Sequence, residues 1–378
     1  MGLLAGVKVI EIAGLGAAPY GCMMLADMEA EVIRVERVGG NADTPRNSPL
    51  LRNRRTIKLD LKSPQDVAAV LAFVEKADGL IEAFRPGVAE RLGIGPQPCL
   101  ERNPQLVYGR MTGWGQSGPL AQSAGHDLNY IGLTGLLHQI GPTGGKPVVP
   151  LNVIGDFGGG GLLLAYGVVC ALLESRNSGK GQVVDAAMVD GALSFMAMFF
   201  GYRAEGLFLD GPGRNFLGGG AHYYDVYAAK DGKYLSVAPI EPHFYTHFVS
   251  MLGLDPECFL PAGYPAHSAK IVEEDWPRLK AELVEVFKTR TRDEWCAFFA
   301  GSDVCITPVL SLQEAAEHPH NREHQAFIDV KGVLQNAPAP RYSRTPAPLP
   351  QAQAGPCPVR LLFAEWGLDW TANEHEVE

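Results

Sequence analysis

His126 is the first of three side chains whose type and position suit proton transfer. It lies in the segment Gly125-His126-Asp127, after a loop rich in glycine, proline and serine and before an apolar stretch. A histidine at such a junction can present its imidazole to a pocket and exchange protons near neutral pH. The alternative interpretation is a structural histidine whose ring nitrogens are satisfied by their neighbours.

Asp156 precedes a run of four glycines, Gly158–Gly161, which opens a long apolar segment. An aspartate in this position typically caps the helix that follows. The glycines also allow a ligand to approach the backbone, and a helix N-terminus favours negative charge. Asp156 is therefore predicted either as a cap or as an acid–base group beside a carboxylate or an enolate.

Glu241 is a third candidate, placed between a predicted strand and Pro242. It is either an acid that complements a helix dipole or a carboxylate that orients a histidine. The histidines between residues 318 and 324 have a spacing that resembles a metal site, but nothing beside them supports one. We predict a solvated loop there and no metal.

Basic side chains crowd one stretch of a chain whose net charge is −10. They suit a ligand with several phosphates, or they form a solvated basic face. They are Arg34, Arg37, Arg46, Arg52, Arg54, Arg55, Lys58 and Lys62, with Arg85 and Arg91 further on. Gly14 and Gly16 match the first two glycines of a dinucleotide-binding fingerprint, but Pro19 stands where the third belongs, so that fingerprint is incomplete.

The elements that must hold these residues alternate over the first third of the chain. Apolar strands are predicted at 7–12, 31–36, 56–61, 79–84 and 106–111, with helices at 17–28 and 64–77. This alternation predicts an α/β layer with a largely parallel sheet. Residues 162–207 are mostly apolar and helical, and a smaller β-rich and then helical domain is predicted over 223–315.

Composition argues against several classes of protein. The acidic balance opposes nucleic-acid binding, and the seven scattered cysteines, none in a CxxC pair, indicate reduced thiols. Residues 1–12 show no signal-peptide pattern. The uncharged stretch 157–173 is shorter than the roughly 20 residues of a membrane span. We therefore expect a cytoplasmic protein without a membrane segment.

Several segments, taken in order, resemble a known family. They are residues 113–119, 124–130, 155–161, 179–185, 238–242 and 302–309. Over about residues 4–345 the chain resembles the α-methylacyl-CoA racemases, within the formyl-CoA-transferase-like (class III) CoA-transferase superfamily. The combination of segments is specific, although no single segment is.

The resemblance implies a Rossmann-like large domain plus a smaller α+β domain, in an interlocked homodimer. The implied boundaries are 1–187 for the large CoA-binding domain, 188–222 for a helical linker, 223–315 for the small domain and 316–378 for a C-terminal return to the large domain. The implied active site lies between the large domain of one subunit and the small domain of the other. Glu241 would then come from the partner chain.

The resemblance also implies roles. His126 and Asp156 match the catalytic acid–base pair, and Glu241 matches the acid that hydrogen-bonds the histidine. The implied contacts with the CoA thioester are Arg37, Lys58, Leu59, Asp60, Leu61, Lys62, Glu82, Arg85, Arg91, Gly125, Asp127, Leu128, Asn129 and Tyr130. Coenzyme A would be part of the substrate, so no separate cofactor is expected.

The expected reaction interconverts (2R)- and (2S)-2-methylacyl-CoA thioesters by 1,1-proton transfer through an enolate, stabilised at the backbone N–H near Asp127. One alternative is a CoA transferase with Asp156 as the nucleophile. A second is a non-catalytic acyl-CoA-binding protein. The chain departs from the racemase pattern at Gly218-Gly219-Gly220-Ala221-His222, which leaves the acyl preference open and adds His222 as a polar group near the site.

Overall fold

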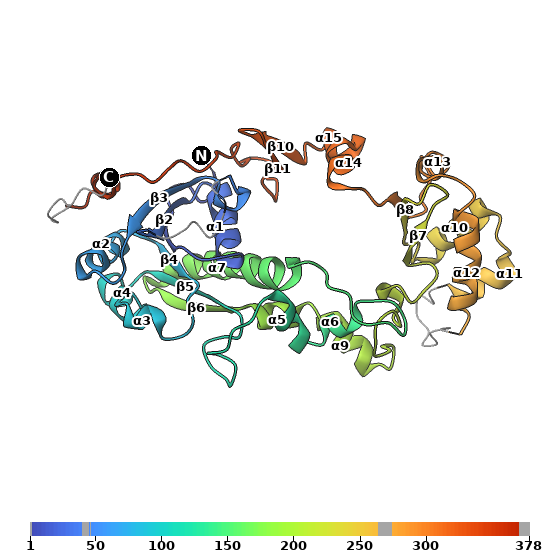
Figure 1. The fold of residues 1–378 in the computed structure, drawn as a ribbon, viewed down its shortest axis with the longest axis horizontal. Helices are drawn as coiled ribbons and strands as arrows, with labels where there is room; N and C mark the ends of the chain where they lie inside the picture. Colours follow the sequence, from blue (N-terminus) through green and yellow to red (C-terminus); the bar gives the residue numbers. More distant parts are fainter. Residues whose placement is uncertain (1, 40–44, 46, 264–273, 370–378) are drawn as a thin grey trace. The chain divides into compact units, whose positions relative to one another are not determined.

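The computed structural model describes residues 2–39, 45, 47–263 and 274–369. The chain divides into two compact units, and it leaves the first unit and later returns to it (Figure 1). Unit 1 comprises Met1–Leu133, Leu151–Phe195 and Glu323–Glu378, and unit 2 comprises Thr134–Pro150 and Met196–Arg322. Residues 134–150 thus cluster with the second unit, although the predicted boundaries include them in the large domain.

Unit 1 is built on a parallel sheet of six strands in the order β3-β2-β1-β4-β5-β6. The strands are β1 Lys8–Ile12, β2 Glu31–Arg37, β3 Arg54–Leu59, β4 Gly79–Glu82, β5 Val107–Thr112 and β6 Gln182–Ala187. The parallel sheet predicted from the sequence is confirmed. The strand order reverses between β1 and β4, and ligands of such sheets bind at the carboxyl ends of the strands near this reversal.

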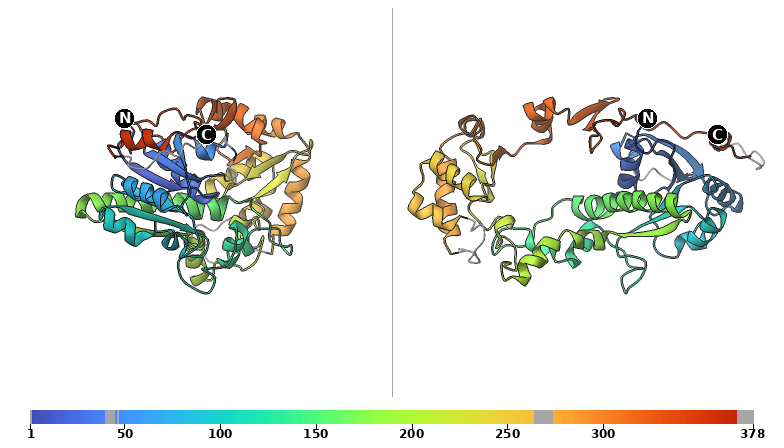
Figure 2. Two further views of the ribbon diagram at one scale, coloured as in Figure 1. Left: turned by 60° about the vertical axis from the view of Figure 1, so that its left-hand side comes forward. Right: turned by 180° about the vertical axis from the view of Figure 1, so that it is seen from behind.

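Helices cover both faces of this sheet because alternate residues of each strand face opposite sides (Figures 1 and 2). Ile10 and Ile12 of β1 pack with α2 and α16, whereas Val7 and Val9 pack with α1 and α7. The helices are α1 Ala17–Asp27, η1 Pro49–Leu51, α2 Pro64–Val74, α3 Val88–Arg91, α4 Pro96–Arg102, α5 Asp127–Leu133, the π-helix η2 Val153–Leu162, α7 Leu163–Ser178, α8 Met188–Ser194 and α16 Val359–Glu365.

Helices η2 and α7 run on as one apolar helix, Val153–Ser178, of 26 residues. By length and composition it is the one helix in the described part of the chain that could cross a membrane, with 44% of its most apolar window buried. The predicted stretch of 157–173 was too short because the glycines and the residues before them are also helical. The helix packs on β5, β6 and α1, as a core helix does.

The C-terminal return is fastened to unit 1 by Arg52, of which 1% is exposed. Its guanidinium makes a bidentate ion pair with Asp27 of α1, at 2.9 and 2.5 Å. The same guanidinium donates to Gln335 Oε1 at 2.9 Å and to the carbonyl of Asn336 at 2.8 Å. Both acceptors belong to β11 Val333–Asn336, which pairs with β10 Phe327–Val330.

Unit 2 contains a three-stranded antiparallel sheet, β7-β8-β9, packed on helices around an aromatic core. Its elements are α6 Leu136–Gln139, α9 Ala197–Ala204, η3 Phe216–Gly218, β7 Asp225–Ala228, β8 Tyr234–Val237, α10 Pro242–Leu252, α11 Pro256–Phe259, η4 Leu260–Ala262, α12 Trp276–Phe287, α13 Arg292–Phe298, β9 Ile306–Pro308 and α14 Leu312–Glu317, followed by α15 Pro319–Glu323.

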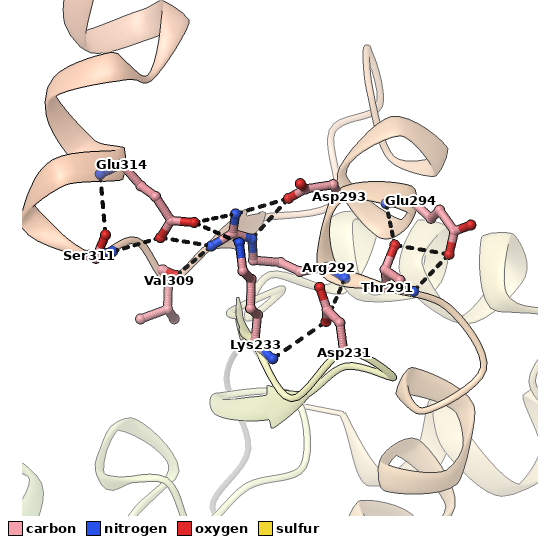
Figure 3. A network of polar contacts seen from close by, with 9 residues as sticks. All are labelled: Asp231, Lys233, Thr291, Arg292, Asp293, Glu294, Val309, Ser311 and Glu314. Atoms are coloured by element: carbon pink, nitrogen blue, oxygen red, sulfur yellow. Dashed lines mark hydrogen bonds and ion pairs between the residues drawn. The ribbon is translucent and has the colours of Figure 1, made fainter.

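Arg292 at the start of α13 organises a polar network in unit 2 (Figure 3). Its guanidinium donates to Glu314 of α14 at 3.2 and 2.9 Å and to the carbonyl of Val309 at 3.2 Å. Lys233 beside β8 also reaches Glu314, at 2.8 Å. Three segments that are distant in the sequence are thereby joined through one carboxylate.

Candidate active site

His126 lies at the junction between the loop after β5 and helix α5. Its carbonyl oxygen accepts the backbone N–H groups of Asn129 at 2.8 Å and Tyr130 at 3.2 Å, so it occupies the N-cap position. The side chain of Asn129 in turn accepts the N–H of His126 at 3.0 Å. These bonds fix the backbone of His126 while its imidazole is exposed and free to meet a substrate.

An aromatic pair supports this junction. The ring of Tyr130 meets Trp114 edge-on, with centroids 4.7 Å apart, and its hydroxyl donates to the carbonyl of Gly125. A Cβ atom at Gly113 would fall 2.1 Å from the ring of Tyr130, and one at Gly125 would fall 2.8 Å from Trp114. Both positions therefore require glycine.

Asp156 is the fourth residue of the π-helix η2, and its carboxyl group is half-buried. It is not the cap that one interpretation of the sequence predicted, because the helix begins earlier and Asn152 is the N-cap residue. The amide of Asn152 donates to Asp156 Oδ2 at 3.0 Å. Burial raises the pKa of Asp156, the charge of Asp127 adds to the rise, and Asn152 and His126 oppose it.

The glycine run after Asp156 serves helix packing. A Cβ at Gly161 would lie 2.4 Å from the carbonyl oxygen of Ala17 in α1, and one at Gly159 would lie 2.6 Å from the backbone of Ala192 in α8. The predicted close approach of a ligand is therefore wrong for Gly159 and Gly161, because the backbone of neighbouring helices already occupies that space.

Asp127 connects the two catalytic candidates. Its side chain is 3% exposed, and Oδ2 accepts the backbone N–H groups of Gly155 at 2.5 Å and Asp156 at 2.7 Å. The carboxylate therefore faces the protein, so a contact with the thioester from this position is left to the backbone. The other two members of the predicted thioester segment on α5, Leu128 and Asn129, are exposed.

The predicted nucleotide contacts gather at the carboxyl edge of the sheet. Arg37 ends β2 and pairs in register with Leu59 of β3, beside the exposed Lys58. Asp60, Leu61 and Lys62 follow β3, and Arg85 and Arg91 are exposed beyond β4. Arg85 also reaches the carbonyl of Gln122 at 3.4 Å, which docks the loop before His126.

Much of the basic stretch is internal, which neither interpretation of the sequence predicted. Arg34 and Arg54 both pair with Glu11, which is fully buried, and Arg52 pairs with Asp27. Arg55 pairs with Glu31 and Glu365, and Arg46 lies outside the described residues. The cations left at the surface of this stretch, among the described residues, are Arg37, Lys58 and Lys62.

Glu82 was predicted as a CoA contact, but its carboxylate is fully buried at the end of β4. It accepts from Arg110 at 3.0 Å and from the N–H of Phe84 at 2.6 Å. Burial raises its pKa, against the influence of Phe84 and Arg110. Its side chain therefore braces the strand ends and is not open to a ligand.

Two further candidates belong to unit 2. Glu241 is the N-cap residue of α10 but makes no capping hydrogen bond with its side chain, which is exposed. His222 is not the extra polar group near the site that the sequence predicted. It is fully buried, with Nε2 2.6 Å from the hydroxyl of Tyr245, and burial lowers its pKa to about 3.

Sequence reasoning missed two supporting residues, Asn152 and Glu11. Asn152 precedes Asp156 by four positions, a spacing at which side chains meet on a helix, so that signal was present. Glu11 gave a weaker signal, because an acid within an apolar strand indicates a buried partner without saying which one. Among the described residues, no group of three or more His, Cys, Asp or Glu side chains could hold a metal ion.

Comparison with known proteins gives a consistent result. A family model described as CoA-transferase family III matches residues 4–358. α-Methylacyl-CoA racemase of Mus musculus is 43% identical over 355 residues, covering 94% of this chain and 90% of that protein. The racemase of Homo sapiens is 40% identical, covering 91% and 87%. The crystal structure of a CAIB/BAIF family protein from Brucella suis matches 97% of this chain and 99% of that one, with a TM-score of 0.81 at 24% identity.

Proposed function

This chain belongs to CoA-transferase family III, and on that premise we propose that it is an acyl-CoA racemase that interconverts (2R)- and (2S)-2-methylacyl-CoA thioesters. The single observation that carries the proposal is the bond from the backbone N–H of Asp156 to the carboxylate of Asp127, at 2.7 Å. Because Asp127 directly follows His126, this bond ties the half-buried acid to the residue next to the exposed histidine. An acid–base pair suits proton transfer at one carbon, whereas binding alone needs neither group. The racemases of mouse and human support the substrate class.

The mechanism uses the two groups in opposite protonation states. Neutral His126 takes the α-proton of the 2S thioester, and the electron pair of the broken C–H bond moves onto the carbonyl oxygen as an enolate. Protonated Asp156 then returns a proton to the opposite face and gives the 2R epimer. The raised pKa of Asp156 suits this step, because it enlarges the protonated fraction. The reverse reaction exchanges the two roles.

The enolate oxygen needs donors at the point where its charge develops. We propose that the backbone N–H at Asp127 supplies one, since it opens helix α5 and its donor end is polarised. The exposed side chains of Arg37 and Lys58 suit the nucleotide part of coenzyme A, and Arg85 and Arg91 suit its phosphates. Coenzyme A enters as part of the substrate, and we propose no separate cofactor.

We further propose that the enzyme is a homodimer in which Glu241 of one subunit orients His126 of the other. The continuous helix of η2 and α7 supports this proposal, because it carries an apolar stripe with large exposed side chains. They are Leu162 at 44%, Tyr166 at 67% and Leu173 at 59% exposure. Such a stripe on a helix that packs on the sheet suits a second copy of the chain better than lipid. The seven free cysteines fit a reducing cytoplasm, where we place the enzyme.

The test of the activity is isotope exchange. Each epimer of a 2-methylacyl-CoA is incubated in deuterated water, and we expect deuterium at the α-carbon together with epimerisation. The variants H126A and D156N should each reduce turnover by at least about a hundredfold, since general acid–base catalysis contributes about 10²–10⁴-fold. Wild-type protein that neither exchanges nor epimerises would exclude the racemase.

The dimer is tested by co-expressing two inactive chains, H126A and E241A. If Glu241 acts across the interface, the mixed dimer contains one site with both residues intact and regains about half of the wild-type activity. If Glu241 acts within its own chain, the mixture stays inactive.

The family name also brings a second candidate, a CoA transferase. In that reaction the Asp156 carboxylate attacks the thioester carbonyl, the C–S bond breaks and CoA leaves as a thiolate, so that an acyl anhydride remains on the enzyme. Hydroxylamine traps such an anhydride. A hydroxylamine-sensitive adduct without α-proton exchange would favour the transferase.

A further inference from the structure

Asp127 has a side chain that the proposed mechanism leaves unused. The mechanism draws on its backbone N–H, yet its carboxylate is almost fully buried, with 3% of the residue exposed. Burying a carboxylate costs free energy unless it receives hydrogen bonds. Here Oδ2 accepts two short backbone bonds, from Gly155 and Asp156, while Oδ1 has no hydrogen-bond partner in the structure.

The two N–H groups that it accepts come from the first turn of η2. Backbone N–H groups in the first turn of a helix have no partner within that helix, because the carbonyls that they would bond lie before its start. Gly155 and Asp156 are the third and fourth residues of η2. Asn152 is the N-cap residue of η2, but its side chain makes no capping hydrogen bond. Asp127, from helix α5, supplies the cap instead.

The same carboxylate stands at a second helix start. Asp127 is the first residue of α5 and directly follows His126. One buried negative charge therefore faces the positive ends of two helices, which stabilises it there. The space around it is filled, since a Cβ at Gly155 would lie 2.8 Å from Asp127 Oδ2. Any shift of Asp127 moves both the backbone of His126 and that of Asp156.

We propose that the Asp127 carboxylate is a positioning residue that holds the imidazole of His126 and the carboxyl group of Asp156 at a fixed separation by capping η2. The proposal rests on the racemase function proposed above. Asp127 would hold His126 and Asp156 in a fixed arrangement, so that the two groups can act on opposite faces of the same substrate carbon. Proton transfer on either face then depends on hydrogen bonds between backbone and side chain that no substrate touches.

The charge of Asp127 gives the proposal a second measurable effect. The groups that act electrostatically on Asp156 are Asp127, which favours its protonated form, and His126, which favours its ionised form, with Tyr130 close by. Removing the charge of Asp127 while keeping its shape should therefore lower the pKa of Asp156. Removing the side chain should also release the start of η2.

The experiment compares D127N and D127A with the matched control E101Q, which alters an exposed carboxylate on α4. D127N keeps one oxygen to accept the two N–H groups. We expect its KM to stay within about twofold, and the acid limb of its kcat/KM profile for the 2R epimer to move to lower pH. D127A should lose about a hundredfold in kcat for both epimers, the size of effect that a misplacement of about 1 Å produces. E101Q should match the wild type in all three measurements.

Two outcomes would overturn the positioning role. One is D127A with wild-type kcat for both epimers, and the other is a loss in D127A and D127N that appears only in KM with no movement of the pH profile. A carbon-13 titration of the Asp156 carboxyl group in wild type and D127N gives a readout that needs no turnover. If its pKa does not fall in D127N, the charge coupling is refuted even where the enzyme proves to be no racemase. Wild-type exchange failing while that pKa does fall would refute the function alone.

Discussion

The contact between α8 and η2 predicts a strong effect from a single methyl group at Gly191. A Cβ atom there would lie 1.9 Å from the carbonyl oxygen of Gly159 and 2.6 Å from its carbonyl carbon, whereas real Cβ contacts are hardly ever under 3.0 Å. The variant G191A must therefore move two helices apart by about 1.1 Å at this point. Backbone, not a flexible side chain, has to give way.

Overpacking of this kind costs about 1–3 kcal/mol, and occasionally more. For a unit of this size we expect a fall in melting temperature of roughly 2–12 °C, at about 2–4 °C per kcal/mol. Activity should fall further than stability, because Asp156 lies on the helix that is displaced. Proton exchange at a temperature where the variant is fully folded measures that part of the effect.

The control is Gly132, an exposed glycine within α5 of the same unit, where a Cβ would meet nothing within 4 Å. G132A should stabilise the protein by roughly 0.5–1 kcal/mol, because alanine loses less chain entropy than glycine in a helix. Urea unfolding of both variants checks the pair. If G191A unfolds at the same urea concentration as the wild type, the close packing of α8 on η2 is refuted.

Three further predictions concern charge. R52M should lower the free energy of unfolding by about 3–5 kcal/mol in urea titrations, because it leaves the buried Asp27 carboxylate without its ion-pair partner. R55M, which breaks two partly exposed pairs, with Glu31 and Glu365, should cost about 1 kcal/mol or less for each pair. The pKa of His222 is about 3 in the folded protein and 6.5 in the unfolded chain. The free energy of unfolding should therefore fall as pH drops below 6.5, by about 2 kcal/mol at pH 5. In paired unfolding curves, H222Q should lose less unfolding free energy than the wild type between pH 6.5 and pH 5. Because the pKa of Asp156 is raised, its ionised form, which acts as the base for the 2R epimer, is lost at a pH above the ordinary carboxyl value of 3.8. Initial rates with the 2R epimer should therefore begin to fall with decreasing pH while the pH is still above 3.8. An acid limb of the rate profile at or below pH 3.8 would contradict the raised pKa.

Local patterns were enough to predict most of the elements in unit 1. The strands at β1, β2 and β4 are short apolar runs, and Ser63 with Pro64 marks the start of α2, where the Ser63 hydroxyl accepts the N–H of Asp66. Such signals depend on neighbours in the chain, so they can be read without the fold. For His126 and Asp156 the local pattern allows a structural and a catalytic interpretation alike, and the catalytic one remains a prediction that depends on the resemblance of the flanking segments.

What could not be predicted depends on partners that are distant in the sequence. The arginines of the basic stretch looked alike, yet Arg34 and Arg54 face Glu11 because three strands pair in one register. The role of the glycines after Asp156 depends on how closely α1 and α8 approach η2. The π-helix itself shifts Asp156 from a cap to the fourth residue of a helix. None of these facts is encoded within a single local window.

The guanidinium of Arg52 also sets the order in which the protein can be completed during synthesis. Arg52 belongs to the N-terminal part of unit 1. The two residues that accept its hydrogen bonds, Gln335 and Asn336, are translated after the whole of unit 2. At about 5–20 residues per second, the residues between Phe195 and Gln335 take on the order of ten seconds to make. During that time unit 1 lacks two of the hydrogen bonds of the buried Arg52 guanidinium. Unit 2, which is synthesised later, can therefore complete its fold before unit 1 does.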